Sequence, residues 1–524
     1  MTEAAVFLTR PQVPLEIISF FGKSTTSSLL VKGVAGTGKT TFALEMLEVM
    51  SSFENVYYVS TRVSNEALYR HYPWLREKEL RAPFKSRAGA PKSGPKAKEM
   101  AFLTPGDYFS KERFMYTGIR RLGEEQKTEA APKPKPERSL NFETPYLDRL
   151  GRREAIPDIE AVYRKVNENI PNKSFFVLDS LKGLVGKYHL ESEELIFTLQ
   201  KDLVERNYAD ILIVMEEMGP TPIDFLVDGV VEIRKYEEGG RRYRTITLQK
   251  LRGEEIRQPE YLITLHKGHF KSLPPYTPLQ LRAPIKVKPR TAPAGFFSTG
   301  SPEIDEILEG GYPRGSNVLI EFGAGVPNDA TKLLVTCTVL NALASGSGIL
   351  LTPFAGTSLS ELEAMAKAAG LDTEFRNHLV VTTHSGGILE DDINVLPLDF
   401  MEIEEDMRKY QRSRKALEDR TQKGTLEIVG VSTVVSRYGW EAYSRDLNIS
   451  AEMTKAEGAL TIRLATSEKT EVLEKISAIS DIHIGLQERC GTILFYGVKP
   501  KTQFYHISWK VEDGMPLPTL VPIV

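Results

Sequence analysis

The residue types and spacing at positions 33–40 are those of a loop that binds phosphate. A glycine, four variable positions and a second glycine precede the pair Lys39 and Thr40, between an apolar run and a helix-forming segment. Glycines let backbone N–H groups face phosphate oxygens, and the helix that follows adds the positive end of its dipole. Lys39 would reach the β- and γ-phosphates, and the Thr40 hydroxyl would ligate Mg²⁺. The residues predicted to bind ATP here are Gly33, Val34, Ala35, Gly36, Thr37, Gly38, Lys39, Thr40 and Thr41.

A carboxylate for the metal is predicted at Asp179. Four apolar residues, 175–178, precede it, so it stands at the carboxyl end of a buried strand. Ligands of open parallel sheets bind at that edge. We therefore predict that Asp179 and Thr40 hold Mg²⁺ and that Asp179 belongs to the ATP site. The alternative, an aspartate that only caps the next helix, is disfavoured by the phosphate-binding loop.

A third group of residues that could take part in chemistry is the pair Lys250 and Arg252. They are two positions apart in a predicted strand, so both side chains lie on the same face. A solvated strand face is the alternative interpretation, and the pattern alone does not exclude it.

Composition restricts the class of protein. The chain has 524 residues, a net charge of −3 and 41% hydrophobic residues, which is typical of a soluble protein with more than one domain. Its bulk charge does not favour a nucleic-acid partner. The N-terminus has no signal-peptide pattern and no segment is apolar enough to cross a membrane. Its two distant cysteines fit a reducing compartment. We expect a cytoplasmic protein without a membrane partner.

Predicted strands and helices alternate along the chain, which indicates α/β architecture with mostly parallel sheets. Residues 76–100 and 123–139 are rich in charge and proline and poor in apolar residues, so we predict a mobile insertion at about 76–157. Repeated prolines at 272–293 predict an extended linker. The predicted domains are therefore residues 1–271 and 294–524.

Taken together, these motifs resemble the RecA-like ATPases of the KaiC group. The phosphate-binding loop, Asp179, and the Lys250-x-Arg252-Gly253 element occur in the order found in that family. The resemblance implies tandem RecA/KaiC-like P-loop domains. It also implies that Lys250 and Arg252 act on the γ-phosphate in the nucleotide site of a neighbouring subunit, which would make the chain a homo-oligomer. On this resemblance, Lys39, Lys250 and Arg252 are the candidate catalytic residues.

The second half also resembles a KaiC-type unit, but a degenerate one. Residues 298–315 are close to the entry motif of the family, whereas the loop at 323–332 has no Lys-Thr pair at its end. Pro327 and Asp329 occupy that loop, and an aspartate there would repel phosphate. Gly430 stands where the metal-binding aspartate is expected. We predict that this domain does not bind nucleotide productively.

The first half departs from the family as well. Active members carry a pair of catalytic glutamates after the second strand, where this chain has Ser60, Thr61 and Arg62, and the nearest carboxylate is Glu66. Removing a general base typically slows a reaction about 10²–10⁴-fold, so ATP hydrolysis is expected to be slow at best. Arg62 would contact phosphate or form a salt bridge, and the sequence leaves both open.

A narrower resemblance is to the archaeal gas vesicle regulatory protein D (GvpD) family. It rests on a short segment at 15–21 before the loop, Ser-Thr-Arg after strand two, a charged insertion and a degenerate second half. The resemblance implies a P-loop protein that represses gas vesicle formation by acting on a transcriptional activator. It also implies an arginine-rich patch, for which residues 241–244 and the basic residues of 76–100 are candidates.

Three hypotheses of function follow. The first is a nucleotide-dependent regulatory switch that acts on a protein partner. The second is a RecA-like ATPase stimulated by DNA, and the third is a KaiC-like autokinase that modifies Ser432 or Thr433. The acidic net charge disfavours the second, and the degenerate second loop disfavours the third.

Overall fold

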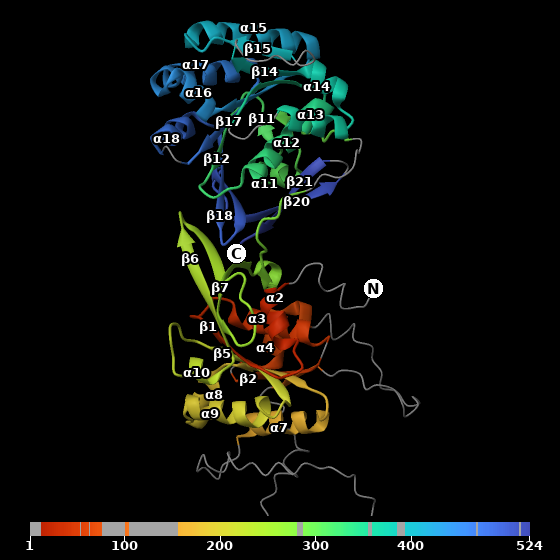
Figure 1. Cartoon of the computed structure of the whole chain (residues 1–524), viewed down its shortest axis with the longest axis vertical. Helices are drawn as coiled ribbons and strands as arrows, with labels where there is room; N and C mark the ends of the chain where they lie inside the picture. Colours follow the sequence, from red (N-terminus) through yellow and green to blue (C-terminus); the bar gives the residue numbers. More distant parts are fainter. Residues whose placement is uncertain are drawn as a thin grey trace, which may run out of the picture. The chain divides into compact units, whose positions relative to one another are not determined.

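The computed structural model describes residues 12–52, 54–61, 63–75, 100–103, 156–279, 287–354, 359–384, 394–467, 470–512 and 515–524. Most of the insertion predicted at 76–157 lies outside these residues. The chain divides into two compact units, the first of residues 1–236 and 244–272, the second of residues 237–243 and 273–524. Figure 1 shows the elements of each unit, and each unit is described by itself.

The first unit is built on a nine-stranded sheet in the order β3-β2-β4-β5-β1-β6-β7-β8-β9. The pairs from β3 to β6 are parallel, and β8 pairs antiparallel with both β7 and β9. The strands are β1 (Ser28–Lys32), β2 (Asn55–Ser60), β3 (Met100–Leu103), β4 (Ser174–Asp179), β5 (Ala209–Met215), β6 (Gly229–Glu238), β7 (Arg241–Leu251), β8 (Glu260–Thr264) and β9 (Lys271–Ser272).

Helices cover both faces of this sheet because its central strands are apolar on both sides. One core cluster joins the sheet to α2 (Leu15–Phe21), α3 (Lys39–Met50) and α4 (Asn65–His71). The other joins it to α7 (Pro157–Asn169), α8 (Leu181–Tyr188), α9 (Ser192–Leu199) and α10 (Ile223–Leu226). A π-helical turn, Gln200–Val204, extends α9. The strand β1 therefore lies in the middle of the sheet, between β5 and β6, with its carboxyl end pointing into the loop that precedes α3.

The second unit has a ten-stranded sheet in the order β15-β14-β13-β16-β17-β12-β18-β19-β20-β21. Its strands are β12 (Asn317–Phe322), β13 (Gly348–Thr352), β14 (Leu379–His384), β15 (Asn394–Leu398), β16 (Thr425–Gly430), β17 (Leu460–Thr466), β18 (Ile482–Arg489), β19 (Thr492–Lys499), β20 (Tyr505–Glu512) and β21 (Met515–Pro522). A small separate pair is formed by β10 (Phe296–Phe297) and β11 (Tyr312–Pro313).

Two sets of helices flank this sheet as well (Figure 1). The helices that share the main core cluster are α11 (Pro302–Ile307), α12 (Asn328–Ala344), α13 (Leu359–Ala368) and α14 (Asp372–His378). The others are α15 (Ile403–Thr421), α16 (Val431–Tyr438), α17 (Trp440–Glu457) and α18 (Thr470–Ile479). Because the run β13-β16-β17-β12-β18 repeats the run β2-β4-β5-β1-β6, the two units have one topology. The predicted α/β class is confirmed.

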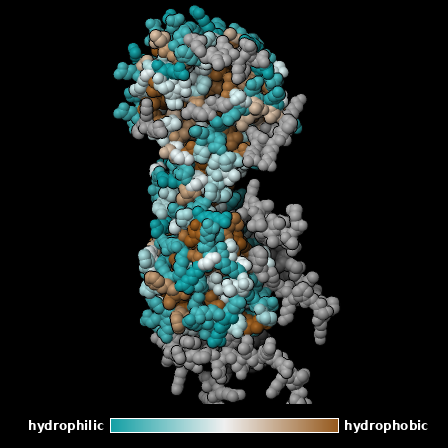
Figure 2. Space-filling view, in the orientation of Figure 1, coloured by the Kyte–Doolittle hydropathy of each residue, from teal (hydrophilic) through white to brown (hydrophobic). Residues whose placement is uncertain are grey.

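The face of the molecule drawn in Figure 2 is mainly polar among its coloured residues. On the face drawn in Figure 2, hydrophilic side chains predominate and hydrophobic ones appear in small patches. Across the part of the chain that the structure describes, no helix is both long and apolar enough to cross a membrane.

Asp210 ties the beginning of β5 to the segment that enters β1. Its side chain is fully buried, and Oδ1 accepts a hydrogen bond of 2.6 Å from the Ser27 N–H. Burial, assisted by the negative charge of Glu54, raises the pKa of Asp210 to about 8. The unfolded aspartate titrates near pH 4. The folded chain therefore binds an extra proton between these values, and the free energy of unfolding falls as pH rises through that window.

We predict that Asp210→Asn removes this fall in the free energy of unfolding at higher pH. An amide carries no charge at any pH, and it keeps an oxygen that can accept the hydrogen bond from Ser27. The variant should melt about 3 °C above the wild type at pH 8.5, with a smaller difference at pH 5.5. Thermal unfolding followed by circular dichroism at both pH values measures this. A difference that does not depend on pH would contradict the assignment of the proton to Asp210.

Candidate functional site

The predicted phosphate-binding loop joins β1 to α3. β1 is buried along its whole length, and the chain leaves it at Gly33, whose N–H donates to the Glu217 carbonyl at 3.0 Å. Gly36 and Gly38 have φ angles of 76° and 106°, which glycine adopts without strain. Gly38 is the N-cap of α3, and no side chain caps that end of the helix. The first N–H groups of α3 are therefore available to an anion.

Two side chains of the loop fold back onto one carbonyl. Lys39 Nζ donates to the Val34 oxygen at 2.8 Å, and Thr37 Oγ1 donates to the same oxygen at 3.0 Å. Lys39 is buried, whereas Val34, Ala35 and Gly36 are exposed. The loop thus holds the ammonium group inside its own turn, while its tip faces solvent.

The structure brings Thr40 and Asp179 together. Thr40 is in the first turn of α3 and Asp179 ends β4, and Thr40 Oγ1 donates to Asp179 Oδ2 at 2.7 Å. The strand order places β4 next to β5 and β5 next to β1, all parallel, so the carboxyl ends of β1 and β4 share one edge of the sheet. The pairing predicted from the sequence is present as a direct hydrogen bond.

These residues fit a nucleotide with Mg²⁺. An open glycine loop, an uncapped helix end and a lysine match the phosphates, and a hydroxyl next to a carboxylate matches the oxygen ligands of Mg²⁺. In nucleotide sites Mg²⁺ usually takes one or two protein oxygens and completes its shell with phosphates and water. Thr40 and Asp179 supply that number. Thr40 and Asp179 would hold Mg²⁺ there, and the bound cation would supply positive charge to offset that of the phosphates.

Two tyrosines that sequence reasoning missed contact residues of this site, one of them the Asp179 carboxylate and the other Thr41. Tyr58, in β2, donates to Asp179 Oδ2 at 2.6 Å. The Tyr72 hydroxyl, just after α4, lies 3.1 Å from Thr41 Oγ1. The sequence does contain a signal for Tyr58, because Tyr57 and Tyr58 are consecutive in a buried strand. Successive side chains of a strand point to opposite faces, so one of the two must face the side of the loop.

The position of the family's catalytic glutamates is taken by a hydroxyl. Thr61 follows β2, and its Oγ1 accepts from the Ser180 N–H at 3.1 Å. Arg62 lies outside the described residues. Glu66 is exposed at the start of α4, and Glu217 pairs with Lys182 at 3.5 Å. Slow hydrolysis therefore remains a prediction.

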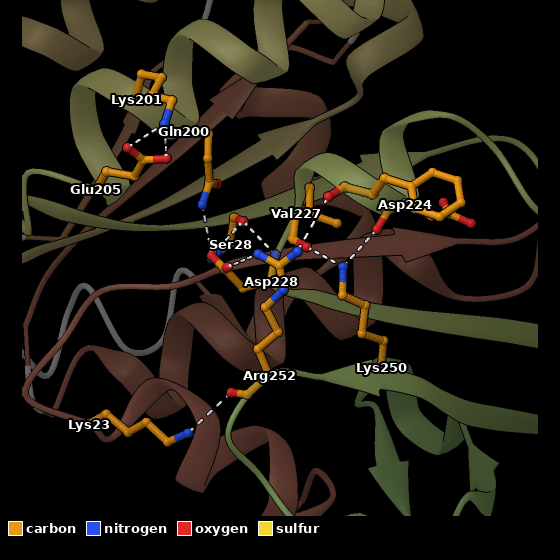
Figure 3. A network of polar contacts seen from close by, with 11 residues as sticks. Lys23, Ser28, Gln200, Lys201, Glu205, Asp224, Val227, Asp228, Lys250 and Arg252 are labelled. Atoms are coloured by element: carbon orange, nitrogen blue, oxygen red, sulfur yellow. Dashed lines mark hydrogen bonds and ion pairs between the residues drawn. The ribbon is translucent and has the colours of Figure 1, made fainter.

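Lys250 lies near the end of β7 and contacts the segment that carries α10. Its Nζ donates to the carbonyls of Asp224 at 2.8 Å and Val227 at 2.6 Å (Figure 3). Burial, followed by the charge of Arg252, lowers the pKa of Lys250. The amine therefore serves as a donor to two backbone carbonyls within its own chain.

Arg252 is held by the same segment. Its Nη1 lies 3.2 Å from Asp228 Oδ1, and 57% of its side chain is exposed. Asp228 also accepts hydrogen bonds from Ser28 and from Gln200, as Figure 3 shows. In contrast to Lys250, this guanidinium leaves much of its surface open to a second molecule.

Lys250 and Arg252 do not lie at the phosphate-binding loop of their own chain. Asp228 and Ser28 precede β6 and open β1, which run parallel with Leu29 opposite Gly229. This is the amino edge of the two strands, whereas the loop leaves β1 at its carboxyl edge. Within one chain, the pair and the loop are therefore at opposite edges of the sheet.

One residue of the arginine-rich run at 241–244 does reach the loop. Arg244 is buried in β7, and its Nη2 donates to the Gly36 carbonyl at 3.4 Å. It therefore supports the exposed tip of the phosphate-binding loop from within the first unit. An exposed patch would have to come from the other basic candidates.

The corresponding loop of the second unit has lost its charges for phosphate. Asp329 lies in the first turn of α12, where its Oδ2 accepts from the Tyr276 hydroxyl at 3.0 Å. Lys332 pairs with Glu361 at 2.8 Å. A cavity of about 200 Å³ remains at the loop, lined by apolar side chains, by glycines 323 and 325, and by polar residues that include Thr331 and Ser432. Among the described residues that line this cavity, none is charged.

Gly430 ends β16 as Asp179 ends β4, and the space for a side chain is gone. A Cβ there would lie 2.2 Å from the Pro353 carbonyl oxygen and 2.7 Å from the Phe354 Cα. The backbone that follows β13 thus occupies the place of a metal-binding carboxylate. The packing of this unit therefore leaves no space for a carboxylate at position 430.

Comparison with known proteins gives one family match and several relatives. Residues 17–87 match the family described as GvpD gas vesicle protein, P-loop domain. The chain is 25% identical to protein GvpD2 and 24% identical to protein GvpD1, both of Halobacterium salinarum. Each match covers 98% of this chain and 96% of the relative.

A more distant likeness is to circadian clock proteins. The circadian clock oscillator protein KaiC 1 of Synechocystis sp. is 25% identical over 43% of this chain and 44% of its own length. These matches confirm the resemblance to the GvpD family and, more widely, to the KaiC group. They also agree with tandem RecA-like domains.

We predict that Gly430→Ala destabilises the second unit by about 2 kcal/mol, because the added methyl group overpacks against Pro353 and Phe354. Urea unfolding followed by tryptophan fluorescence measures this, since Trp440 and Trp509 both lie in that unit. Gly186→Ala in α8 of the first unit is the control, because nothing lies within 4 Å of its Cβ position, and its unfolding is followed through Trp74 of the same unit. Equal stability of the two variants would contradict the steric argument.

Proposed function

We propose that this chain, a GvpD-like P-loop protein of the KaiC and RecA type, binds ATP with Mg²⁺ and uses the bound nucleotide to control a protein partner. The matching family is described as a gas vesicle protein, and the two relatives, GvpD1 and GvpD2, carry the name of that family. The partner that the resemblance implies is a transcriptional activator of gas vesicle formation, and the outcome is repression.

The observation that carries this proposal is a direct connection between the phosphate-binding loop and the segment before β6, residues 217–228. Lys32, the last residue of β1, is fully buried, and its Nζ contacts both carboxylate oxygens of Asp224 at 2.9 Å. It also donates to the Gly219 carbonyl. The next residue, Gly33, bonds to the Glu217 carbonyl. Residues 217–224 are thus fixed to the base of the loop.

This segment also reaches the surface. Phe225, next to Asp224, is 81% exposed, which is unusual for a phenylalanine on a short helix that is bonded at both ends. Lys250 holds the carbonyls on either side of it. Any change at the end of β1 that follows nucleotide binding would therefore pass to Phe225, Lys250 and Arg252 together.

Homo-oligomerisation belongs to the proposal for a geometric reason. Since Lys250 and Arg252 lie at the edge of the sheet opposite their own loop, only a second subunit offers them a bound γ-phosphate. Arg252 has the exposed surface for such a contact, and Lys250 would first leave its carbonyl partners. Turnover is expected to be slow because Thr61 takes the place of a general base.

We predict that Lys39→Ala weakens ATP binding about 10- to 100-fold, since it removes a charged hydrogen-bond donor from the phosphates. Lys332→Ala, at the degenerate loop, is the matched control and should bind ATP as the wild type does. Titration of a fluorescent ATP analogue with Mg²⁺ measures both.

The same variants test the regulatory role. Affinity capture from an extract of the source cells, with quantitative mass spectrometry, compares the wild type with and without Mg·ATP and the Lys39→Ala variant with Mg·ATP. We expect a partner that depends on ATP and is absent with Lys39→Ala. Equal capture in all three samples would refute the switch. ATP turnover that rises with single-stranded DNA would favour the RecA-like alternative.

We predict further that Mg·ATP slows hydrogen–deuterium exchange in residues 217–228 of the wild type. Asp224→Asn should abolish this response, because it weakens the contacts of Asp224 with Lys32 and Thr221. It should change ATP affinity less than about threefold, because the phosphate-binding residues themselves are unchanged. Glu205→Gln, which affects an exposed pair with Lys201 beside the same network, is the control. A full response in Asp224→Asn would show that the signal takes another route.

A further inference from the structure

Tyr58 has an unusual position for a tyrosine in the middle of a sheet. It lies in β2, between β3 and β4, and is 2% exposed. Its neighbour Tyr57 points to the other face, where its hydroxyl accepts from Asn169 Nδ2 at 2.7 Å. Because side chains alternate along a strand, Tyr58 must face the side of the sheet on which α3 and the phosphate-binding loop lie.

The Tyr58 hydroxyl meets the carboxylate of Asp179 within this buried space. Ser60 is the register partner of Asp179, so Tyr58 is two residues earlier on the same face, and its ring spans the distance. Its hydroxyl donates to Oδ2 at 2.6 Å. An ordinary phenol titrates near pH 10, so the hydroxyl is the donor in this contact and the carboxylate is the acceptor.

The same oxygen accepts the hydrogen bond from Thr40. Oδ2 of Asp179 thus has two hydroxyl donors, at 2.6 Å from β2 and at 2.7 Å from α3. Two donors on one oxygen fix the rotation of a carboxylate more firmly than one does. The adjacent Thr41 is held in turn by the Tyr72 hydroxyl at 3.1 Å.

We propose that Tyr58 is a positioning residue of the Mg²⁺ site, holding the Asp179 carboxylate so that it and the Thr40 hydroxyl are presented to the metal together. The proposal rests on the proposed binding of ATP with Mg²⁺. Partners in the second shell of metal ligands typically contribute about 10- to 100-fold to metal affinity, because they orient the ligand before the metal arrives. A phenol that only satisfies a buried carboxylate would stabilise the fold and leave the metal dependence unchanged.

The test is the Mg²⁺ dependence of nucleotide binding in Tyr58→Phe, with Tyr57→Phe as the matched control. Both variants remove one buried hydroxyl from adjacent residues of β2, but only Tyr58 contacts Asp179. A fluorescent ATP analogue is titrated at fixed Mg²⁺ concentrations and in EDTA. We expect the Mg²⁺ concentration for half-maximal binding to rise about tenfold in Tyr58→Phe, with less than a twofold change in EDTA. Tyr57→Phe should match the wild type in both series.

A second comparison separates positioning from a general effect. In an Asp179→Asn background the added change Tyr58→Phe should have no further effect on Mg²⁺ dependence, because Tyr58 acts through that carboxylate. Additive effects would overturn the inference, and so would equal Mg²⁺ dependence in Tyr58→Phe and Tyr57→Phe.

Two further results keep the test decisive. If the wild type binds no nucleotide analogue, the proposed function fails, whereas binding with an unchanged Tyr58→Phe titration defeats the role of Tyr58 alone. Should Tyr58→Phe not fold, an experimental structure of the wild type with Mg²⁺ and a non-hydrolysable ATP analogue decides the question. The hydroxyl of Tyr58 should still bond to Asp179 there, and a broken contact would overturn the proposal.

Discussion

The hydrogen bond between Thr40 and Asp179 depends on the parallel alignment of three strands. The two residues are 139 positions apart, and they meet because β1, β5 and β4 run in the same direction and end at the same edge of the sheet. Reversing any one of these strands would carry its terminal residue to the other edge. Because β6 is also parallel to β1, Asp228, just before β6, lies at the opposite edge, and there it pairs with Arg252. Parallel strands therefore bring Thr40 and Asp179 together and leave the basic pair at the other edge.

The sequence was sufficient for those parts of the site that depend on local pattern. The phosphate-binding loop follows from spacing, and Asp179 follows from an apolar run that ends in a carboxylate. Contacts across the sheet could not be predicted in the same way. Tyr58 reaches Asp179 because of the register between β2 and β4, and Arg244 reaches Gly36 from β7. The residues near the loop do not determine either of these alignments. Lys32 was also missed, since a charged residue at the end of an apolar strand has no local pattern that predicts a buried ion pair.

The second unit has the same strand order as the first but different residues at the edge that corresponds to the nucleotide site. Its strand order repeats that of the first unit, so the carboxyl ends of β12 and β16 still share an edge. What changed is the chemistry at that edge. The loop carries Asp329 in the first helical turn, and the backbone of Pro353 and Phe354 closes over Gly430. Because a glycine is now needed for packing, a substitution that restored the carboxylate would meet backbone atoms. Sheet topology and core packing are maintained, whereas the phosphate charges are lost.

The buried ion pair of Lys32 limits how the first unit can respond to its nucleotide. A lysine removed from water is tolerated only while its charge is compensated, and breaking such a pair costs several kcal/mol when one partner stays buried. Lys32 is fully buried and finds that compensation in Asp224 and Gly219, both in the segment before β6. The end of β1 and this segment must therefore move together or remain together. Since Phe225 and the carbonyls held by Lys250 belong to that segment, a displacement at the loop reaches the surface through one charged contact. This coupling would follow because the buried ammonium group of Lys32 must keep its charge compensated by Asp224.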